Sequence, residues 1–192
     1  MNKIHSTFTV SFMGVDGSGK TTISKKLKKK LKKSQYLHLK PYILFQDKRT
    51  IIKNPQDQIK SSSLMSLLRL LSWLVSYKIF FFKKKKNNFY IFDRYAHDIL
   101  IDPLRYKHSL STYLTKFILN FFPKPDLWIF LKPSFSTVKM RKSELRDREL
   151  RRQIKEYSYF FKNKKNVLIL NTNRRINVLI TIIISQINFL IK

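Results

Sequence analysis

Eight residues near the amino terminus have the types and spacing of a phosphate-binding loop. Residues 14–21 read GVDGSGKT and satisfy the pattern G-x-x-x-x-G-K-[ST]. In such a loop, backbone N–H groups surround a phosphate, the lysine reaches the β- and γ-phosphate oxygens, and the last hydroxyl ligates Mg²⁺. We therefore expect a nucleoside triphosphate, most simply MgATP, to bind here. The expected binding residues are Gly14, Gly17, Ser18, Gly19, Lys20, Thr21 and Thr22.

The glycine content of the chain supports the same interpretation. The 192 residues include only three glycines, and all three lie in this loop. Glycine is needed where the backbone adopts positive φ or approaches a phosphate closely. A chain that forms its other turns with different residues therefore concentrates its glycine where a phosphate would bind.

The elements around the loop have the order of an α/β protein. Residues 8–13 form an apolar run that predicts a buried strand before the loop, and Ile23, Leu27 and Leu31 predict an amphipathic helix after it. Further strands are expected at residues 36–39, 89–92, 127–131 and 167–170, with helices between them. This alternation predicts a five-stranded parallel sheet covered on both faces, a three-layer α/β/α sandwich.

Two apolar stretches could be mistaken for membrane spans. Residues 64–82 contain Arg69 and Lys78, and residues 176–191 contain several polar side chains. Neither offers the roughly 20 uninterrupted apolar residues of a span. We expect both to be buried helices of one domain, residues 1–192, without an integral membrane span.

Composition limits the remaining classes of function. The chain has no cysteine, which excludes disulfides and thiol catalysis and fits a cytoplasmic location. Its formal net charge is +29, with abundant Lys, Ile and Asn and scarce Gly and Pro, as an AT-rich genome would produce. We expect most lysines to lie on the solvated surface and polyanions to bind non-specifically at low salt.

Three motifs in order resemble the thymidylate kinase family of nucleoside monophosphate kinases. They are residues 14–22 (GVDGSGKTT), 92–95 (FDRY) and 125–131 (PDLWIFL), followed downstream by Arg141. Residues 93–106 also resemble a thymidylate-kinase-like branch found among surface-polysaccharide genes. The resemblance implies a P-loop kinase fold and ATP-dependent conversion of dTMP to dTDP. It also implies an acceptor-binding region at about 41–80 and a lid at about 141–152.

The same resemblance implies roles for residues outside the loop. Asp93 would join Thr21 in holding Mg²⁺, and Arg94 would clamp the acceptor phosphate. Asp16, Arg69 and Tyr95 would bind the acceptor. Lys20, Asp93 and Arg94 would be catalytic, together with the lid residues Arg141, Arg146 and Arg148, which would neutralise charge on the transferred phosphoryl group.

Departures from the family leave the acceptor open. Residues 96–102 (AHDILID) replace the usual thymine-nucleotide motif, Lys132 and Asn171 stand where aspartates are common, and the lid has no glycine. One alternative is a P-loop kinase of a sugar, lipid-linked or other small phosphate in envelope biosynthesis. A second is a non-enzymatic, basic module that binds nucleoside triphosphates or nucleic acid. Whether the chain forms a homodimer is also left open.

Overall fold

The computed structural model describes residues 7–39, 58–141 and 147–191. The chain divides into two compact units. The sheet unit comprises residues 1–39, 84–95 and 125–192, and the helical unit comprises residues 40–83 and 96–124. The expectation of a single domain stays a prediction.

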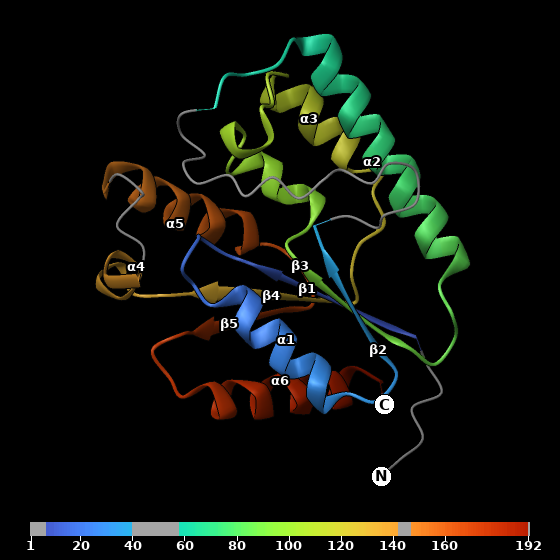
Figure 1. Ribbon diagram of the computed structural model, residues 1–192, viewed down its shortest axis with the longest axis vertical. Coiled ribbons are helices and arrows are strands. Elements are labelled where there is room, and N and C mark those ends of the chain that lie inside the picture. The colour runs from blue at the N-terminus through green and yellow to red at the C-terminus, as the bar shows by residue number, and fades with distance from the viewer. Residues whose placement is uncertain (1–6, 40–57, 142–146, 192) are drawn as a thin grey trace. The chain divides into compact units, whose positions relative to one another are not determined.

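Five parallel strands form the centre of the sheet unit (Figure 1). Their order is β2-β3-β1-β4-β5. Because every neighbouring pair is parallel, all strands end at one edge, here called the carboxyl edge, and begin at the opposite, amino edge. The predicted five-stranded parallel sheet is confirmed. Its strands are β1 (Phe8–Met13), β2 (Ser34–His38), β3 (Phe89–Asp93), β4 (Leu127–Lys132) and β5 (Val167–Asn171).

One face of the sheet is covered by two helices with aliphatic faces. Helix α1 (Lys20–Lys30) and helix α6 (Ile176–Ile191) share one buried cluster with alternate residues of the strands. Leu27 and Ile183 are fully buried in that cluster, beside Ile129 of β4. The amphipathic helix predicted after the loop is therefore confirmed, and the apolar stretch 176–191 packs on the sheet as expected.

The other face of the sheet carries an aromatic layer. Trp128 and Phe130 of β4 point to this face because successive side chains of a strand alternate. Phe130 stacks on Tyr157 and Phe161 of helix α5 (Asp147–Phe161), with ring centroids 5.8 and 5.2 Å away. A short helix, α4 (Phe135–Arg141), follows β4. The three-layer arrangement predicted from the sequence is thus present.

The helical unit is built around helix α2 (Ser63–Lys83). Its buried side chains Leu70, Trp73 and Tyr77 recur at helical spacing. Trp73 packs edge-on against Tyr106, with ring centroids 5.6 Å apart, and Tyr77 packs against Phe122 at 5.4 Å. The unit is completed by two 3₁₀ helices, η2 (Ala96–Leu100) and η3 (Leu104–Tyr106), and by α3 (Thr112–Leu119).

The expectation that residues 64–82 form a buried helix is wrong. Opposite its buried face, α2 presents a second apolar stripe to solvent, formed by Leu64, Leu68, Leu71, Val75 and Phe82. A helix that is apolar on both sides gives no sequence signal of which side is covered. Among the described helices, α2 alone is long and apolar enough to cross a membrane. Core helices of soluble proteins can have the same length and composition. In α2, 28% of the most apolar 18-residue stretch is buried within the protein.

Candidate active site

The phosphate-binding loop leaves β1 and passes close to the end of β4. Gly14 has φ of 147°, and a Cβ atom at this position would lie 2.6 Å from the carbonyl oxygen of Leu131. Any side chain would therefore push the loop away from the sheet. Glycine is required here by the close approach of two backbones, as the sequence pattern implied.

Gly19 directs the start of helix α1. It is the N-cap residue, with φ of 89° in the left-handed region, and its carbonyl accepts the first helical hydrogen bond from Ile23 N at 3.0 Å. This turn places the N-terminal end of α1, with its partial positive charge, beside the loop. Gly17 also has positive φ. Among the described residues, the buried hydroxyl of Ser18 has no hydrogen-bond partner, whereas Thr22 is exposed.

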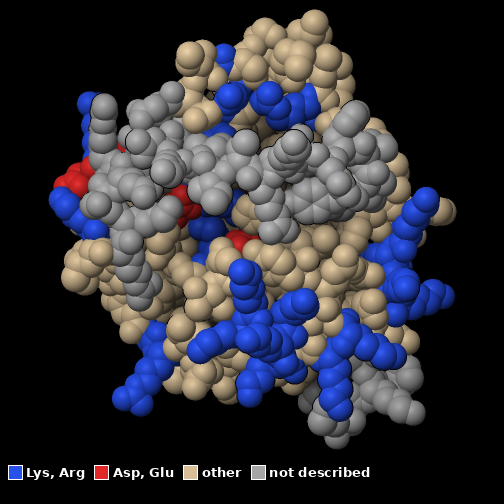
Figure 2. Space-filling view, viewed as in Figure 1, with Lys and Arg blue, Asp and Glu red and all other residues tan. Residues whose placement is uncertain are grey.

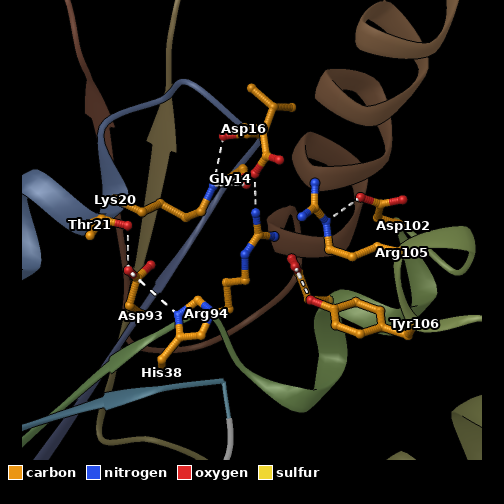
Figure 3. Close-up of polar contacts among 12 residues, drawn as sticks. Gly14, Asp16, Lys20, Thr21, His38, Asp93, Arg94, Asp102, Arg105 and Tyr106 are labelled. Carbon is orange, nitrogen blue, oxygen red and sulfur yellow. Dashed lines mark hydrogen bonds and ion pairs between the residues drawn. The ribbon is translucent and has the colours of Figure 1, made fainter. Parts of the chain in front are cut away.

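Lys20 is buried inside the loop that precedes it. Its ammonium group donates to the carbonyl oxygens of Gly14 at 2.6 Å and Val15 at 2.7 Å, and it lies 3.8 Å from Asp16 Oδ1 (Figure 3). A buried ammonium needs such partners because it has lost its hydration. Its positive charge is thereby fixed where the loop would surround a phosphate.

Asp93 lies at the end of β3 beside Thr21. The Thr21 hydroxyl donates to Asp93 Oδ2 at 2.6 Å (Figure 3). The hydroxyl of Tyr36, in β2, donates to the same oxygen at 2.6 Å. His38 Nδ1 is 3.8 Å from this oxygen. Burial alone would raise the pKa of Asp93, but its polar neighbours, led by His38, and the charge of Lys20 hold that pKa well below its usual range. The carboxyl group is therefore ionised at neutral pH.

The second carboxylate oxygen of Asp93 has the properties of a metal ligand. Asp93 is buried, and within the described part of the chain its Oδ1 atom has no hydrogen-bond partner. A buried anionic oxygen without a partner is costly unless a cation completes its environment. Among the residues described, no group of three or more acidic, imidazole or thiol side chains is placed to hold a metal ion by itself. Mg²⁺ in nucleotide sites needs only one or two protein ligands, because phosphates and water supply the rest, so Asp93 and Thr21 fit this ion.

Arg94 adopts a strained backbone conformation next to Asp93. Its φ is 78°, in the left-handed region that non-glycine residues rarely occupy. Its backbone N–H donates to Phe12 O at 3.0 Å, and its guanidinium forms a partly buried ion pair with Asp16 of the loop (Figure 3). Such conformations cost about 1–3 kcal/mol and persist where the surroundings impose them, commonly at functional sites. The structure thus joins Asp16 and Arg94, which we expected to bind an acceptor.

Two other residues that were expected to bind the acceptor have neighbours within the protein. One is buried, and the other is already hydrogen-bonded. Tyr95 is fully buried in the sheet unit, where its ring packs edge-on against Phe92 and Trp128. In the helical unit, the guanidinium of Arg69 donates to the carbonyl oxygen of Tyr106. Their roles in acceptor binding stay predictions.

The expected lid arginines are only partly described. Arg146 lies outside the described residues, and Arg141 ends α4 without a described side chain. Arg148 is exposed in the first turn of α5. The expected role of these arginines therefore stays a prediction.

An open cavity of about 370 Å³ lies at the carboxyl edge, at the ends of β4 and β5. Its position beside the strand ends is where α/β sheets commonly bind ligands. Lys132 and Asn171, the residues that depart from the family pattern, both contribute to its wall. The full lining is Lys132, Pro133, Ser134, Ile169 and Asn171.

The segment 96–106, which includes the residues 96–102 that replace the usual nucleotide motif, is held together by its own polar side chains. In the helical unit, the Tyr106 hydroxyl donates to Asp98 Oδ2 at 2.8 Å, and Arg105 Nε donates to Asp102 Oδ2 at 2.8 Å (Figure 3). The backbone N–H groups of Ile101 and Asp102 both donate to the Asp98 carbonyl. These residues therefore shape the two 3₁₀ helices.

Tyr36 and His38 were not expected from the sequence to be residues of the site. A weak signal existed, because residues 36–39 were expected to form a short strand. Their relevance depends on β2 lying beside β3, where Leu37 pairs with Phe92 and His38 with Asp93. Strand order is set by tertiary packing and cannot be read from residue types in so short a segment.

Comparisons with known proteins agree with this geometry. The thymidylate kinase family matches residues 12–183 of the chain. Among solved structures, thymidylate kinase from Candida albicans is similar, with a TM-score of 0.66 and 19% identity over 97% of this chain and 94% of that one. Deoxyadenosine kinase from M. mycoides has a TM-score of 0.64 and 19% identity, covering 94% and 99% of the two chains.

A third similar structure is thymidylate kinase from Ehrlichia chaffeensis, with a TM-score of 0.54 and 17% identity over 94% and 98% of the chains. No curated protein sequence matches. At such low identities, the three solved structures show only that the fold is shared. The family is shown by the family match, which spans most of the chain. The protein thus belongs to the thymidylate kinase family and is a kinase with the P-loop fold.

Proposed function

We propose that this protein transfers the γ-phosphoryl group of MgATP to a nucleoside monophosphate, and that dTMP is its preferred acceptor. An oxygen of the acceptor phosphate forms a bond to the γ-phosphorus, the bond from that phosphorus to the β–γ bridging oxygen breaks, and ADP leaves. The observation that carries the proposal is the contact between Thr21 of the loop and Asp93 at the end of β3. It joins a phosphate-binding loop to an ionised carboxylate.

Within this proposal, the residues of the loop bind and orient the donor. Backbone N–H groups of the loop and the start of α1 face the phosphates, and Lys20 supplies a fixed positive charge. Asp93 and Thr21 would hold Mg²⁺, which neutralises negative charge on the phosphates when it is bound. Phosphoryl transfer requires mainly positioning and charge neutralisation, so no side-chain nucleophile is needed.

Arg94 is the residue proposed to bind the acceptor phosphate. Its planar guanidinium suits two parallel hydrogen bonds to phosphate oxygens. In the structure it pairs with Asp16, so an incoming phosphate would compete with that carboxylate. We propose that Asp16 holds Arg94 in place until the acceptor arrives, and then faces the acceptor sugar.

The open cavity at the ends of β4 and β5 is the proposed site of the donor base. It combines Ile169 and Pro133, which offer apolar contact, with Asn171 and Lys132, which offer polar contact. A mixed lining of this kind suits a heterocycle.

A cytoplasmic location, expected from the absence of cysteine, stays a prediction.

A direct test follows phosphoryl transfer from MgATP by ³¹P NMR with a panel of acceptors. The panel contains dTMP, dCMP, dAMP, the corresponding nucleosides and sugar phosphates. We expect dTDP to form with the highest kcat/KM. Preferred transfer to a nucleoside or a sugar phosphate would reject dTMP as the acceptor, and ATP consumption without any phosphorylated acceptor would reject the kinase reaction on this panel.

Thermal stability of the same protein gives an independent measure of acceptor binding. A ligand at 100 times its Kd stabilises the folded state by ~2.7 kcal/mol. We expect dTMP to raise the unfolding temperature in the presence of a non-hydrolysable ATP analogue more than any other monophosphate does. Equal shifts for all monophosphates would show that the site does not select thymine.

A further inference from the structure

Three lysine-rich segments meet at the amino edge of the sheet unit. They immediately precede β2, β3 and β5, and parallel strands begin at a common edge. Backbone contacts hold them there: Phe89 N donates to Lys33 O at 3.0 Å, and Phe8 N donates to Asn88 O at 3.2 Å. At the start of β4, Trp128 N donates to Asn166 O at 2.9 Å. Segments far apart in sequence therefore form one surface, here called the lysine patch.

The lysine patch contains eleven lysines and no acidic residue. Nine of these lysines are exposed, and none of the basic residues is an arginine. Glu156, six residues before Lys162, is exposed on α5 and lies outside these segments. Asp126, which precedes β4 at the same edge, accepts hydrogen bonds from Thr9 N at 2.7 Å and Thr9 Oγ1 at 2.6 Å, so its charge is used inside the unit. Figure 2 shows lysine side chains gathered over α1 with no acidic ones among them. The members are Lys28, Lys29, Lys30, Lys32, Lys33, Lys84, Lys85, Lys86, Lys162, Lys164 and Lys165.

Exposed aromatic side chains lie at the same edge. Phe189, in the last turn of α6, is 71% exposed. Helix α6 ends beside the end of α1, since Ile187 packs in the same buried cluster as Leu27 (Figure 1). Tyr159 is also exposed, and its carbonyl accepts a hydrogen bond from Lys162 N. The patch therefore combines dense positive charge with apolar side chains that the sheet unit does not cover.

This combination fits a lipid surface better than a polynucleotide. Clusters of basic residues bind anionic lipid headgroups through charge, and adjacent apolar side chains enter the boundary between headgroups and acyl chains. Sequence-specific recognition of nucleic acid commonly employs arginine, which pairs with phosphates and bases through its planar fork. The patch has only lysine, the more strongly hydrated point charge.

We propose that the lysine patch binds the surface of a membrane rich in anionic phospholipids, with Phe189 entering the headgroup region. The catalytic loop lies at the opposite, carboxyl edge of the sheet, so a membrane on the amino edge would leave the loop of this unit open to nucleotides. The role is separate from phosphoryl transfer and does not depend on the acceptor.

The first test measures co-sedimentation of the full-length protein with vesicles. One set contains phosphatidylcholine alone, and the other contains phosphatidylcholine and phosphatidylglycerol. We expect binding only to the anionic vesicles and weaker binding as salt rises. The variant Lys29→Gln/Lys32→Gln/Lys33→Gln should bind them roughly 100-fold more weakly, because each surface lysine contributes about a factor of five. Absence of binding to anionic vesicles at physiological salt would overturn the proposal.

A charge-matched control separates the patch from the net charge of the chain. Lys155→Gln/Arg174→Gln/Arg175→Gln removes three exposed positive charges that lie outside the lysine patch. We expect this control to keep its vesicle binding. An equal loss in both variants would show that the overall charge of +29, and not the patch, governs binding. Circular dichroism melting verifies that each variant is folded.

Phe189→Ser distinguishes lipid from polynucleotide. It should weaken binding to anionic vesicles while leaving binding to double-stranded DNA unchanged, because only a bilayer accepts the aromatic ring. Tighter binding to DNA than to vesicles at physiological salt, with no effect of Phe189→Ser on either, would assign the patch to nucleic acid and reject the lipid proposal.

Discussion

At the carboxyl edge of the sheet, Lys20, Asp93 and Arg94 are 5%, 1% and 8% exposed, whereas most lysines of the amino edge project into solvent. The carboxyl-edge charges are held by short contacts to the loop and to neighbouring strands. Burying a charge is costly, and the cost is offset only where partners are positioned in advance. The surface lysines stay hydrated and carry no such cost. The carboxyl edge therefore needs particular residues with particular partners, whereas the amino edge does not.

The difference shows why net charge is a weak guide to catalytic function in this chain. The formal charge of +29 is dominated by residues that are tolerated at almost any exposed position. The few buried charges at the carboxyl edge are constrained in identity, backbone conformation and partner. Substitutions at that edge should therefore affect catalysis or folding strongly, whereas substitutions at the amino edge should not.

The largest effect is expected for Lys20→Ala. Removal of the one buried ammonium in the loop should lower kcat by roughly 100- to 1,000-fold, as loss of a charge-stabilising donor does elsewhere. Steady-state assays with MgATP measure this effect, and Lys25→Ala, on the exposed face of the same helix, is the control. Turnover of Lys20→Ala equal to that of the control would remove Lys20 from the catalytic site.

Arg94→Ala should damage acceptor use more than nucleotide use. We expect acceptor kcat/KM to fall about 100-fold because the guanidinium no longer meets the acceptor phosphate. The KM for ATP should change little. The comparison variant is Lys155→Ala, which alters an exposed basic residue of α5 that has no expected role in the site. Unchanged acceptor KM and kcat in Arg94→Ala would place Arg94 in a purely structural role with Asp16.

Gly14→Ala should destabilise the protein as well as the site. Its Cβ would approach Leu131 O to 2.6 Å, and φ of 147° is unfavourable for alanine. We expect a loss of about 1–3 kcal/mol in the free energy of unfolding. Urea denaturation measures this loss. A variant as stable as the wild type would mean that the loop does not pass the end of β4 as described.

A smaller effect is expected for Tyr36→Phe, which removes one hydrogen bond to Asp93. Such bonds contribute about 1 kcal/mol, so kcat should fall by roughly five-fold and the Mg²⁺ concentration for half-maximal activity should rise. Tyr159→Phe, at an exposed position, provides the control. Identical Mg²⁺ dependence in both variants would show that Tyr36 does not position Asp93.

No measurable effect on catalysis or folding is expected at the amino edge. In Lys29→Gln/Lys32→Gln/Lys33→Gln, each substitution should change the free energy of unfolding by less than about 0.5 kcal/mol. Turnover with MgATP should match that of the wild type. A loss of turnover in this folded variant would break the contrast between the two edges.

Much of the fold could be predicted because buried strands of a doubly covered sheet are continuous apolar runs. The strand expected at residues 8–13 has those bounds in β1, and the strands at 127–131 and 167–170 end one residue later as β4 and β5. The phosphate loop was also predictable, since its chemistry tolerates few residue types. Local patterns of this kind require no knowledge of tertiary neighbours.

The remaining features depend on such neighbours. The exposure of Leu68 and Val75 on α2 could not be inferred, because composition does not show which apolar face is covered. The 3₁₀ helices η2 and η3 follow from contacts such as Tyr106 with Asp98 and not from any periodicity. Likewise, the contact of Tyr36 with Asp93 exists only because β2 lies beside β3.

Lys20, Thr21 and Asp93 are proposed to form a Mg²⁺-dependent triphosphate site, and the function proposed for the protein depends on that site. Isothermal titration of ATP into the protein, with and without Mg²⁺, tests it most directly, using Asp93→Asn and the exposed-site control Asp147→Asn. We expect Mg²⁺ to tighten ATP binding in the wild type and in Asp147→Asn, but not in Asp93→Asn. An absence of binding heat in the wild type, or the same Mg²⁺ dependence in all three proteins, would contradict the account.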